Sequence, residues 1–527
     1  MTVSVSRVQY IWSPILGWAL LTCSASMALA QIGVAVPGVS DTPVTSSDQT
    51  TNSPGDQTGG SSSPGTTGGL SPTVTPPPPV ARPNTIGDIA LPAGTTVANP
   101  STQLIPGLSD TFGGGANAIS LAGFSGGGAP GGEELGITVG SFRLYPAIDI
   151  TTGVDNNVFA TNNVNTGTTT STTTTPTLSL STVVAPSLAL RSDWLNHSIN
   201  FLLGGGFGFY ASAPTQNYQN YFMIVDGKID VRDDLTVIYS FGYRRATEAL
   251  GTANVAFAQA PTVAESIPVT LGLIKRFNRV TVEAGGGVSR AWFTDNSTIS
   301  ASGLDAQSRN RNTYEEHIRL GYDLSDDVTL YVTPSITQTR YNLNPDTLGQ
   351  SRDSSAANLG FGASWVINPT STLSGGVGYS VSSGALGSTS AFTFALAGAW
   401  NGYAPLSLRP SLTRGISESA LSAYRNIVST TLGVEYAYQL FDEFALVGGF
   451  SYSLADYQPA DQAALGQATA AAARQDAFAR GSIGFLWQPR PQFSIGPIFE
   501  YTQGSSSDST GPAYTRQLLS IRLSARR

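Results

Sequence analysis

The fold is decided by a stretch that reads Leu178-Ser-Leu-Ser-Thr-Val-Val-Ala-Pro-Ser-Leu-Ala-Leu190, then Arg191-Ser-Asp-Trp-Leu-Asn-His197, then Ile199-Asn-Phe-Leu-Leu-Gly-Gly-Gly-Phe-Gly-Phe-Tyr210. Apolar and small or polar side chains alternate in the first and third parts, which is the period of a β-strand. The middle part is short and polar. We therefore predict two antiparallel strands joined by a tight turn.

The same unit recurs to the end of the 527-residue chain, and its repetition predicts an all-β fold. Repeated hairpins with short turns at one end and long loops at the other are typical of a transmembrane antiparallel up-and-down β-barrel. Strands of roughly 10 to 15 residues suit a tilted membrane crossing. About eighteen strands are predicted, near residues 138–151, 175–190, 197–210, 219–231, 234–247, 264–275, 279–292, 312–323, 327–341, 354–367, 371–381, 389–400, 405–415, 423–439, 442–456, 474–488, 491–503 and 513–525.

The connections alternate in length along the chain. Short polar breaks follow even-numbered predicted strands, at residues 233–234, 277–278, 325–327, 368–370, 441–443 and 489–491. Longer loops, such as residues 156–174, 250–262, 295–310 and 458–472, follow odd-numbered ones. This predicts that all short turns lie on the periplasmic side and all long loops outside.

The strand predicted over residues 327–341 has two distinct faces. Val328, Leu330 and Ile336 share one face, and Thr329, Tyr331, Thr333, Ser335, Thr337 and Thr339 share the other. A soluble β-sandwich with one solvated face would show the same alternation. A membrane barrel is favoured by the strand lengths, the uneven connections and the aromatic residues near strand ends. These aromatic residues are Phe207, Phe209, Tyr210, Tyr239, Phe241, Tyr243, Trp292, Phe293, Trp400 and Trp487.

Residues 1–30 are predicted to be a secretory signal peptide. Arg7 is their only charge, residues 11–21 are apolar, and Ala28-Leu-Ala30 offers a cleavage site. A lipoprotein signal ending at Cys23 is the alternative, but Thr22 stands where a smaller residue is expected. Because Cys23 is the only cysteine, cleavage after Ala30 would exclude disulfides, thiolate metal sites and cysteine nucleophiles.

Residues 31–135 are rich in Gly, Ser, Thr and Pro and have no strand or helix period. Such a composition cannot bury enough apolar surface to offset its conformational entropy. We predict a disordered periplasmic tether; alternatively residues 113–132 fold back into the lumen as a plug. The barrel itself is predicted over residues 136–527.

The charge of the chain argues against a nucleic-acid partner. Charged residues make up 12% of the chain, the formal net charge is −8, and Lys228 and Lys275 are its only lysines. The sequence pI is about 4.9. Nucleic-acid binding proteins usually carry a basic surface instead.

Charged residues on the polar strand face are the candidates for lining an aqueous lumen, which a barrel of this size is wide enough to hold. The predicted pore-lining residues are Arg143, Asp149, Asp226, Lys228, Arg244, Glu283, Glu315, His317, Arg319, Arg409, Arg425, Glu435, Arg480, Glu500, Arg516 and Arg522. Facing rows of arginines and acids would create a transverse field that favours polar solutes. Alternatively, these charges pair with one another and only keep the interior wet.

No sequence pattern predicts catalysis, a cofactor or a metal site. His197 falls in a predicted turn and His317 lies between Glu315 and Arg319, without a nucleophile motif nearby. Asp155-Asn-Asn157 could bind calcium, but a turn is the commoner use of such residues. The Ala-rich segment 461–475 could form a short helix that folds into the lumen or caps it.

One part of the chain resembles a known family. The segments Leu144-Tyr-Pro-Ala-Ile-Asp149, Gly153-Val-Asp-Asn-Asn-Val-Phe159 and Ala185-Pro-Ser-Leu-Ala-Leu-Arg-Ser-Asp-Trp194 are similar to the opening of the putative β-barrel porin 2 family. The resemblance implies residence in the bacterial outer membrane, and some members are found alongside exopolysaccharide export genes. The ending Leu523-Ser-Ala-Arg-Arg527 differs from the aromatic terminus that the barrel-assembly machinery usually recognises.

Two functions are compatible with these features. The first is a passive outer-membrane channel for polar small solutes or polysaccharide, lined by Ser and Thr hydroxyls and an arginine and acid belt. The second is a non-conducting structural or adhesive barrel whose lumen is filled. The expected partners are outer-membrane lipid, the transported solute and the barrel-assembly machinery.

Overall fold

The computed structural model describes residues 136–161, 176–248, 250, 252, 262–294, 306–368, 371–403, 405–461, 471–509 and 511–527. The predicted signal peptide and the segment 31–135 lie outside these ranges. No helix within these ranges is both long and apolar enough to cross a membrane.

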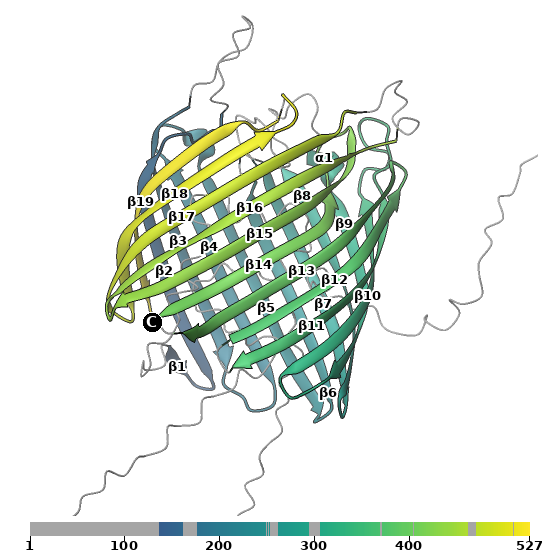
Figure 1. Cartoon of the computed structure of the whole chain (residues 1–527), viewed down its shortest axis with the longest axis horizontal. Coiled ribbons are helices and arrows are strands. Elements are labelled where there is room, and N and C mark those ends of the chain that lie inside the picture. Colours follow the sequence, from purple (N-terminus) through teal and green to yellow (C-terminus); the bar gives the residue numbers. More distant parts are fainter. Residues whose placement is uncertain are drawn as a thin grey trace, which may run out of the picture.

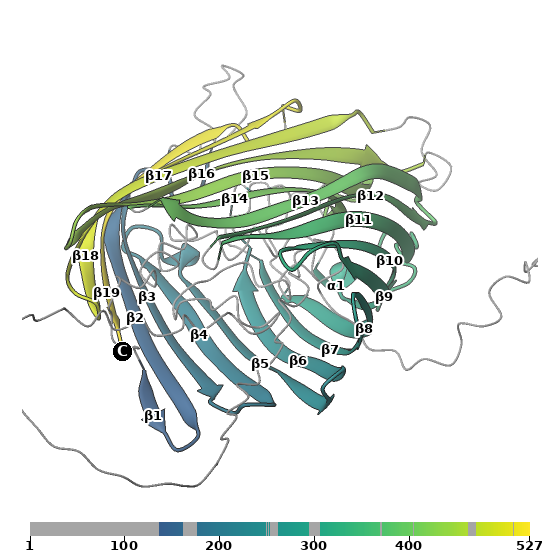
Figure 2. The ribbon, with the colours of Figure 1, turned by 60° about the horizontal axis from the view of Figure 1, so that its bottom comes forward.

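Eighteen antiparallel strands close into a barrel, as the sequence predicts (Figures 1 and 2). Each strand pairs with its neighbours in the chain, and β19 pairs with β2 to complete the ring, from Leu518 opposite Asp155 to Arg526 opposite Ala147. The strands are β2 Phe142–Asp155, β3 Ser179–Ser192, β4 Ser198–Tyr210, β5 Tyr218–Arg232, β6 Leu235–Thr247, β7 Val263–Phe277, β8 Val280–Thr294, β9 Arg311–Asp323, β10 Val328–Tyr341, β11 Ser354–Asn368, β12 Ser371–Gly384, β13 Gly387–Tyr403, β14 Leu406–Glu418, β15 Tyr424–Phe441, β16 Phe444–Pro459, β17 Arg474–Arg490, β18 Phe493–Ser506 and β19 Tyr514–Arg526.

Three short elements accompany the barrel. The strand β1 (Ile137–Val139) folds back on β2, the 3-10 turn η3 (Pro214–Gln216) follows β4, and the helix α1 (Ala306–Arg309) precedes β9. Figure 1 shows β1 and the C-terminus at one end of the barrel and α1 at the other. We call these the turn end and the loop end.

The first predicted strand began four residues too early. The chain reverses at Gly140, whose φ is +61°, and β2 starts only at Phe142. Glycine takes positive φ at little cost, so a tight reversal is possible at this position. The second strand was likewise placed four residues too early.

The prediction that every loop-end connection is long is wrong at one place. Only Ala385 and Leu386 separate β12 from β13. Gly387, with φ +114°, follows this tight turn directly. The turn joins the loop ends of β12 and β13 in a compact hairpin.

The two faces of β10 are as predicted. Thr329, Tyr331 and Thr333 are buried, whereas Leu330 and Ile336 are 43% and 49% exposed. Apolar side chains stand outward on the other strands too, including Phe361 and Phe499. Such a band suits a lipid environment, because each of these side chains would otherwise face water.

Two of the predicted boundary aromatics point inward instead. Tyr210 and Phe293 are each 5% exposed. Tyr210 accepts a hydrogen bond from Arg516, and the Arg309 guanidinium lies over the Phe293 ring. Their strand parity places them on the lumen face, whereas Phe209 and Trp487 are exposed on the outer face.

Candidate functional site: a hydroxyl-lined cavity and its mouth

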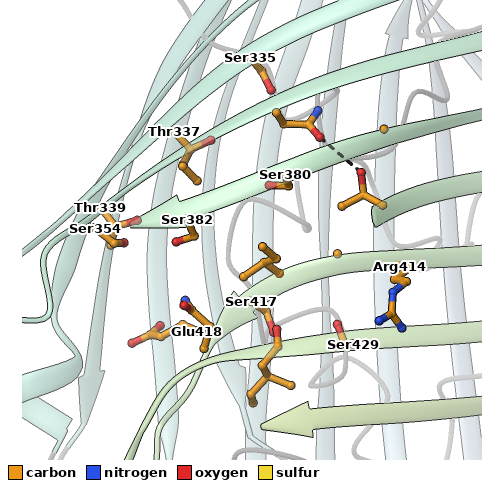
Figure 3. A pocket seen from close by; sticks show the side chains of 18 of the residues that line it. Ser335, Thr337, Thr339, Ser354, Ser380, Ser382, Arg414, Ser417, Glu418 and Ser429 are labelled. Atoms are coloured by element: carbon orange, nitrogen blue, oxygen red, sulfur yellow. Dashed lines mark hydrogen bonds between the residues drawn. The ribbon is translucent and has the colours of Figure 1, made fainter. Parts of the chain in front are cut away.

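A cavity of about 290 Å³ lies inside the barrel against the wall formed by β9 to β16 (Figure 3). Many of its lining residues carry a hydroxyl group. These residues are Thr313, Tyr331, Thr333, Ser335, Thr337, Thr339, Tyr341, Ser354, Ser380, Ser382, Thr393, Thr413, Ser417, Ser429, Thr431 and Ser453.

Glycines beside these hydroxyls make room in the wall. On the inner faces of β11 and β12, Gly360 pairs with Gly378 and Gly362 with Gly376. The Tyr331 ring occupies the space over Gly362, because a Cβ there would lie 2.3 Å from the ring. The Tyr331 hydroxyl then donates to the Gly375 carbonyl oxygen across 3.2 Å, so the ring is fixed against the wall.

Serine and threonine hydroxyls both donate and accept hydrogen bonds. A lumen wall built of them can exchange hydrogen bonds with water or with any solute rich in hydroxyls or amides. Charge is concentrated at one edge of the cavity, where Arg311, Arg352 and Glu418 lie at the loop end. The part of the chain that the structure describes contains no group of three or more potential metal-ligating side chains.

Glu418, at the end of β14, closes the loop end of the cavity. Its carboxylate forms an ion pair with Arg311 at the start of β9. It also accepts a hydrogen bond from the Tyr341 hydroxyl, at the end of β10, across 2.6 Å. The Arg311 and Glu418 side chains are 3% and 13% exposed. One carboxylate therefore joins elements from opposite sides of the cavity.

A second ion pair lies beside it. Arg309 of α1 donates to both carboxylate oxygens of Glu248 over 2.9 and 2.6 Å, and it stacks on Phe293 at 4.0 Å. Burial by itself lowers the pKa of Arg309, but the attraction of Glu248 outweighs it and the pKa is raised. The guanidinium therefore keeps its positive charge beside Glu248.

A third buried pair completes the group. Arg352 donates to Asp346 across 3.1 Å and to the Ser422 carbonyl oxygen across 3.0 Å. We call the three sets, Glu248 with Arg309, Glu418 with Arg311 and Tyr341, and Asp346 with Arg352, the mouth clasp. It ties the connections after β6, β8, β10 and β14 to one another.

Sequence reasoning missed the mouth clasp. Glu248, Arg309, Asp346 and Arg352 lie in connections, where strand parity no longer predicts which way a side chain points. Glu418 lies at the outer end of β14. The available signal was weaker: charged residues gathered at the ends of strands that all finish at the same end of the barrel.

The register places the predicted pore-lining residues on the inner parity. Two of them, Glu315 and Arg425, line the cavity. Glu283 lies opposite Arg319 in the pairing of β8 with β9, and its carboxylate is 3.4 Å from Nε2 of His317. Whether these residues line a conducting pore stays a prediction.

The remaining predicted residues lie elsewhere on the inner wall, and most face an opposite charge. Arg516 contacts Asp155 at 2.5 Å and Arg480 contacts Glu500 at 2.8 Å. The other positions are Arg143 with Asp193 at 3.5 Å, Arg522 with Asp149 at 2.9 Å, Lys228 with Asp230 at 3.4 Å, Arg409 opposite Glu435 in register, Asp226 accepting from Asn200 at 3.0 Å, and Arg244 opposite Ser266 in register. This pairing agrees with the second interpretation of the lumen charges.

The segment Asp155-Asn-Asn157 forms a turn. The Asn157 backbone N–H donates to the Asp155 carboxylate, and the Asn157 amide donates to the Thr161 and Thr515 carbonyl oxygens. Because the Asp155 carboxylate also holds Arg516, these oxygens are already in use.

The predicted helix over residues 461–475 is wrong at its end. Arg474 and Gln475 belong to β17, and Arg474 pairs with Asp476. Residues 462–470 lie outside the described ranges.

Comparisons with known proteins place the chain in a family. The model of the family described as "Putative beta-barrel porin 2" matches residues 129–527. A comparison with curated protein sequences returned no match. Similar solved structures include OccK3 (OpdO) of Pseudomonas aeruginosa, with 11% identity, TM-score 0.36 and coverage of 73% of this chain and 95% of that one. The outer membrane protein OpdK of the same species has 8% identity, TM-score 0.36 and coverage of 73% and 98%.

A mutant of the ferric enterobactin receptor PfeA, also from Pseudomonas aeruginosa, gives 8% identity, TM-score 0.38 and coverage of 73% and 80%. Because these TM-scores are low, we draw no conclusion about the solute or its contacts from the solved structures. The family match covers the whole barrel and does not depend on the solved structures. The chain belongs to the β-barrel porin 2 family and is a β-barrel protein of the outer membrane.

Proposed function

We propose that this protein is a passive outer-membrane channel for polar solutes, and that the solute passes along the hydroxyl-lined cavity. The observation that carries the proposal is the wall of β9 to β16, where serine and threonine hydroxyls face the lumen over many strands. Family membership supports a channel in general terms. We propose transport without catalysis.

Uncharged polyhydroxylated solutes are the class that this wall fits best. Each sugar hydroxyl can exchange its water partners for serine or threonine hydroxyls at little net cost. A polysaccharide, whose repeating units present the same groups, would make repeated weak contacts as it moves. Export of a polysaccharide is therefore the finer form of the proposal, although a passive pore has no intrinsic direction.

The segment before the barrel is proposed to be a periplasmic tether that follows a cleaved signal peptide. Its composition favours this over a lumen plug. Insertion by the barrel-assembly machinery is part of the same proposal.

A non-conducting structural barrel is the second candidate. The mouth clasp favours it, because three buried ion-paired sets tie the outer connections together across the loop end. If the clasp never opens, the lumen is closed and the protein acts through its outer surface.

Proteoliposome swelling separates the two candidates. We expect liposomes that contain the mature chain to swell in isosmotic solutions of neutral mono- and disaccharides, faster than in an anionic sugar of the same size. A chain that begins at Gly136 should swell at the same rate if residues 31–135 are a tether. Swelling of the shortened chain alone would make that segment a plug. The absence of swelling from both, with folding shown by heat-modifiable migration, would contradict the channel.

A further inference from the structure

Strands β13 and β14 are joined at the turn end but separate towards the loop end. Their pairing runs from Tyr403 opposite Leu406 to Phe394 opposite Arg414, with an interruption near Trp400. Beyond Phe394, residues 387–393 of β13 pair with β12, and residues 415–418 of β14 pair with β15. Within these described strands no ladder joins the two segments. We call this unpaired part of the wall the seam.

The outer end of β14 leans into the lumen. Glu418 has the same parity as Arg414, so in a regular strand it would point away from the lumen. Its side chain nevertheless reaches Tyr341 of β10 and Arg311 of β9. The end of β14 is therefore turned towards the lumen.

The cavity extends to the seam. Residues 413–417 of β14 line the cavity, and so do residues 393–395 of β13. The cavity therefore reaches both strands at the point where their ladder ends.

A latch bounds the seam at the loop end. Arg425 of β15 donates to the Thr389 hydroxyl of β13 across 2.8 Å and to the Asp461 carboxylate across 3.0 Å. The Asp461 backbone N–H donates to the Leu386 carbonyl oxygen across 3.0 Å. These contacts join β15 and the end of β16 to the β12–β13 turn. The seam is therefore a window with the latch above it and the Phe394–Arg414 pair below it.

The outer rim of the seam changes from polar to apolar. Ser388 and Ser390 are exposed on the outer face, and Phe392, one step nearer the membrane centre, is 54% exposed. An open strand edge is not tolerated in contact with hydrocarbon, because its backbone groups would lose their hydrogen bonds. A seam at the boundary between headgroups and acyl chains can instead be satisfied by polar groups of a lipid.

Arg414 adds a charge at this boundary. It lies on the outer parity of β14, opposite Phe394, and its side chain donates to the Thr430 hydroxyl across 2.5 Å. A guanidinium has five N–H donors, and one hydroxyl uses only part of them. Phosphate and carboxylate are the groups that such a fork binds best.

We propose that the seam is a lateral portal for an anionic lipid with a hydroxyl-bearing headgroup. Its headgroup enters the hydroxyl-lined cavity beside Ser417, its anionic group binds Arg414, and its acyl chains stay outside against Phe392. The portal uses the same cavity as the proposed channel but does not require flow through the barrel.

Fluorescence quenching by spin-labelled lipid tests the portal. In a Cys23→Ser background, Ser417→Cys is labelled with bimane and the full protein is reconstituted with doxyl-labelled phosphatidylglycerol or phosphatidylcholine. Ser417 faces the lumen, so an intact wall would shield it from lipid. We expect phosphatidylglycerol to quench Ser417→Cys at least threefold more than the matched lumen position Thr413→Cys. Phosphatidylcholine should quench it less. Phe392→Cys is the lipid-facing standard for both.

A disulfide across the seam provides the second arm. If the register of β13 and β14 continued, Ala391 would lie opposite Ser417. A disulfide between Ala391→Cys and Ser417→Cys would therefore close the seam, and the bimane is then attached at a third cysteine nearby. We expect this lock to abolish quenching at a bimane on the inward-facing Gly415→Cys, whereas the lock Ala395→Cys with Thr413→Cys, across strands already paired, leaves it unchanged. Equal quenching of Ser417→Cys and Thr413→Cys would overturn the portal, and equal effects of both lipids would overturn the anionic headgroup. Because locked protein should still swell sugar-filled liposomes if it is a channel, the two proposals fail separately.

Discussion

At the scale of single residues, the loop end is held by arginines that each contact both a carboxylate and an aromatic ring or a carbonyl. Arg309 has Glu248 and Phe293, and Arg352 has Asp346 and the Ser422 carbonyl oxygen. The planar guanidinium fits these sites because it can form two parallel hydrogen bonds while its face stacks. Lysine, with a single point charge, could not replace it without loss.

Replacement of Arg309 tests this reading of the mouth clasp. Arg309→Ala leaves the Glu248 carboxylate, in a residue that is 2% exposed, without its cation. Breaking a buried pair costs on the order of 3–5 kcal/mol. We expect backbone amides near Asn310 to exchange with solvent roughly a hundredfold faster or more, measured by hydrogen–deuterium exchange in detergent.

Two further variants calibrate that experiment. Arg309→Lys keeps the charge but loses the paired hydrogen bonds, so its exchange should fall between wild type and alanine. Arg279→Ala removes an exposed arginine from a turn-end connection and should change nothing at the clasp. Exchange near Asn310 that is the same in Arg309→Ala and Arg279→Ala would show that the pair does not hold the mouth.

At the scale of elements, β10 has one face that suits lipid and another that suits an aqueous lumen. Its outward residues from Val328 to Ile336 are apolar and its inward residues carry hydroxyls, so the same period of two that pairs it with β9 and β11 also sorts its side chains. Glycines on the neighbouring strands keep the inner surface open beside it. The side chains of Thr333, Ser335, Thr337 and Thr339 therefore line the cavity that we propose a solute enters.

Removal of one hydroxyl should weaken sugar binding measurably. Thr337→Val keeps the shape of the side chain but removes a donor and acceptor from the cavity (Figure 3). One hydrogen bond contributes a net of about 0.5–1.5 kcal/mol, so we expect the residence time of a neutral oligosaccharide to fall roughly 2- to 10-fold. Single-channel current block measures it. The matched substitution Thr151→Val, on the inner face of β2 and away from the cavity, should leave it unchanged. If both variants behave alike, the cavity wall is not the sugar path.

The same period explains what the sequence could predict. Eighteen strands were found because lipid and lumen impose opposite demands on successive residues, as in β10 and β9. The reversal at Gly140, the two-residue turn after Gly384 and the inward lean of Glu418 were not found, because each depends on backbone geometry or on a partner far along the chain. The Arg516–Asp155 pair joins residues 361 positions apart, and no local pattern indicates such a contact.

At the scale of the whole molecule, closure of the barrel by β19 and β2 removes the sheet edges except at the seam. A closed ring of eighteen strands is rigid, so passage through it is set by what reaches into the lumen. In the described part of the chain, the mouth clasp is what crosses the loop end, and Glu418 is its central carboxylate. The account therefore predicts that conductance responds to this side chain.

The most direct measurement is single-channel recording in a planar bilayer of the mature chain and of Glu418→Gln. Hydrogen bonds to a charged group contribute about 1.5–3 kcal/mol, so loss of the charge should shift the mouth towards its open form by roughly tenfold or more. We predict stable conductance steps from wild type and a higher open probability from Glu418→Gln. Glu443→Gln, the same substitution at the turn end, should match wild type. The absence of steps from every variant, with the barrel shown to be folded, would contradict the channel and leave the structural barrel.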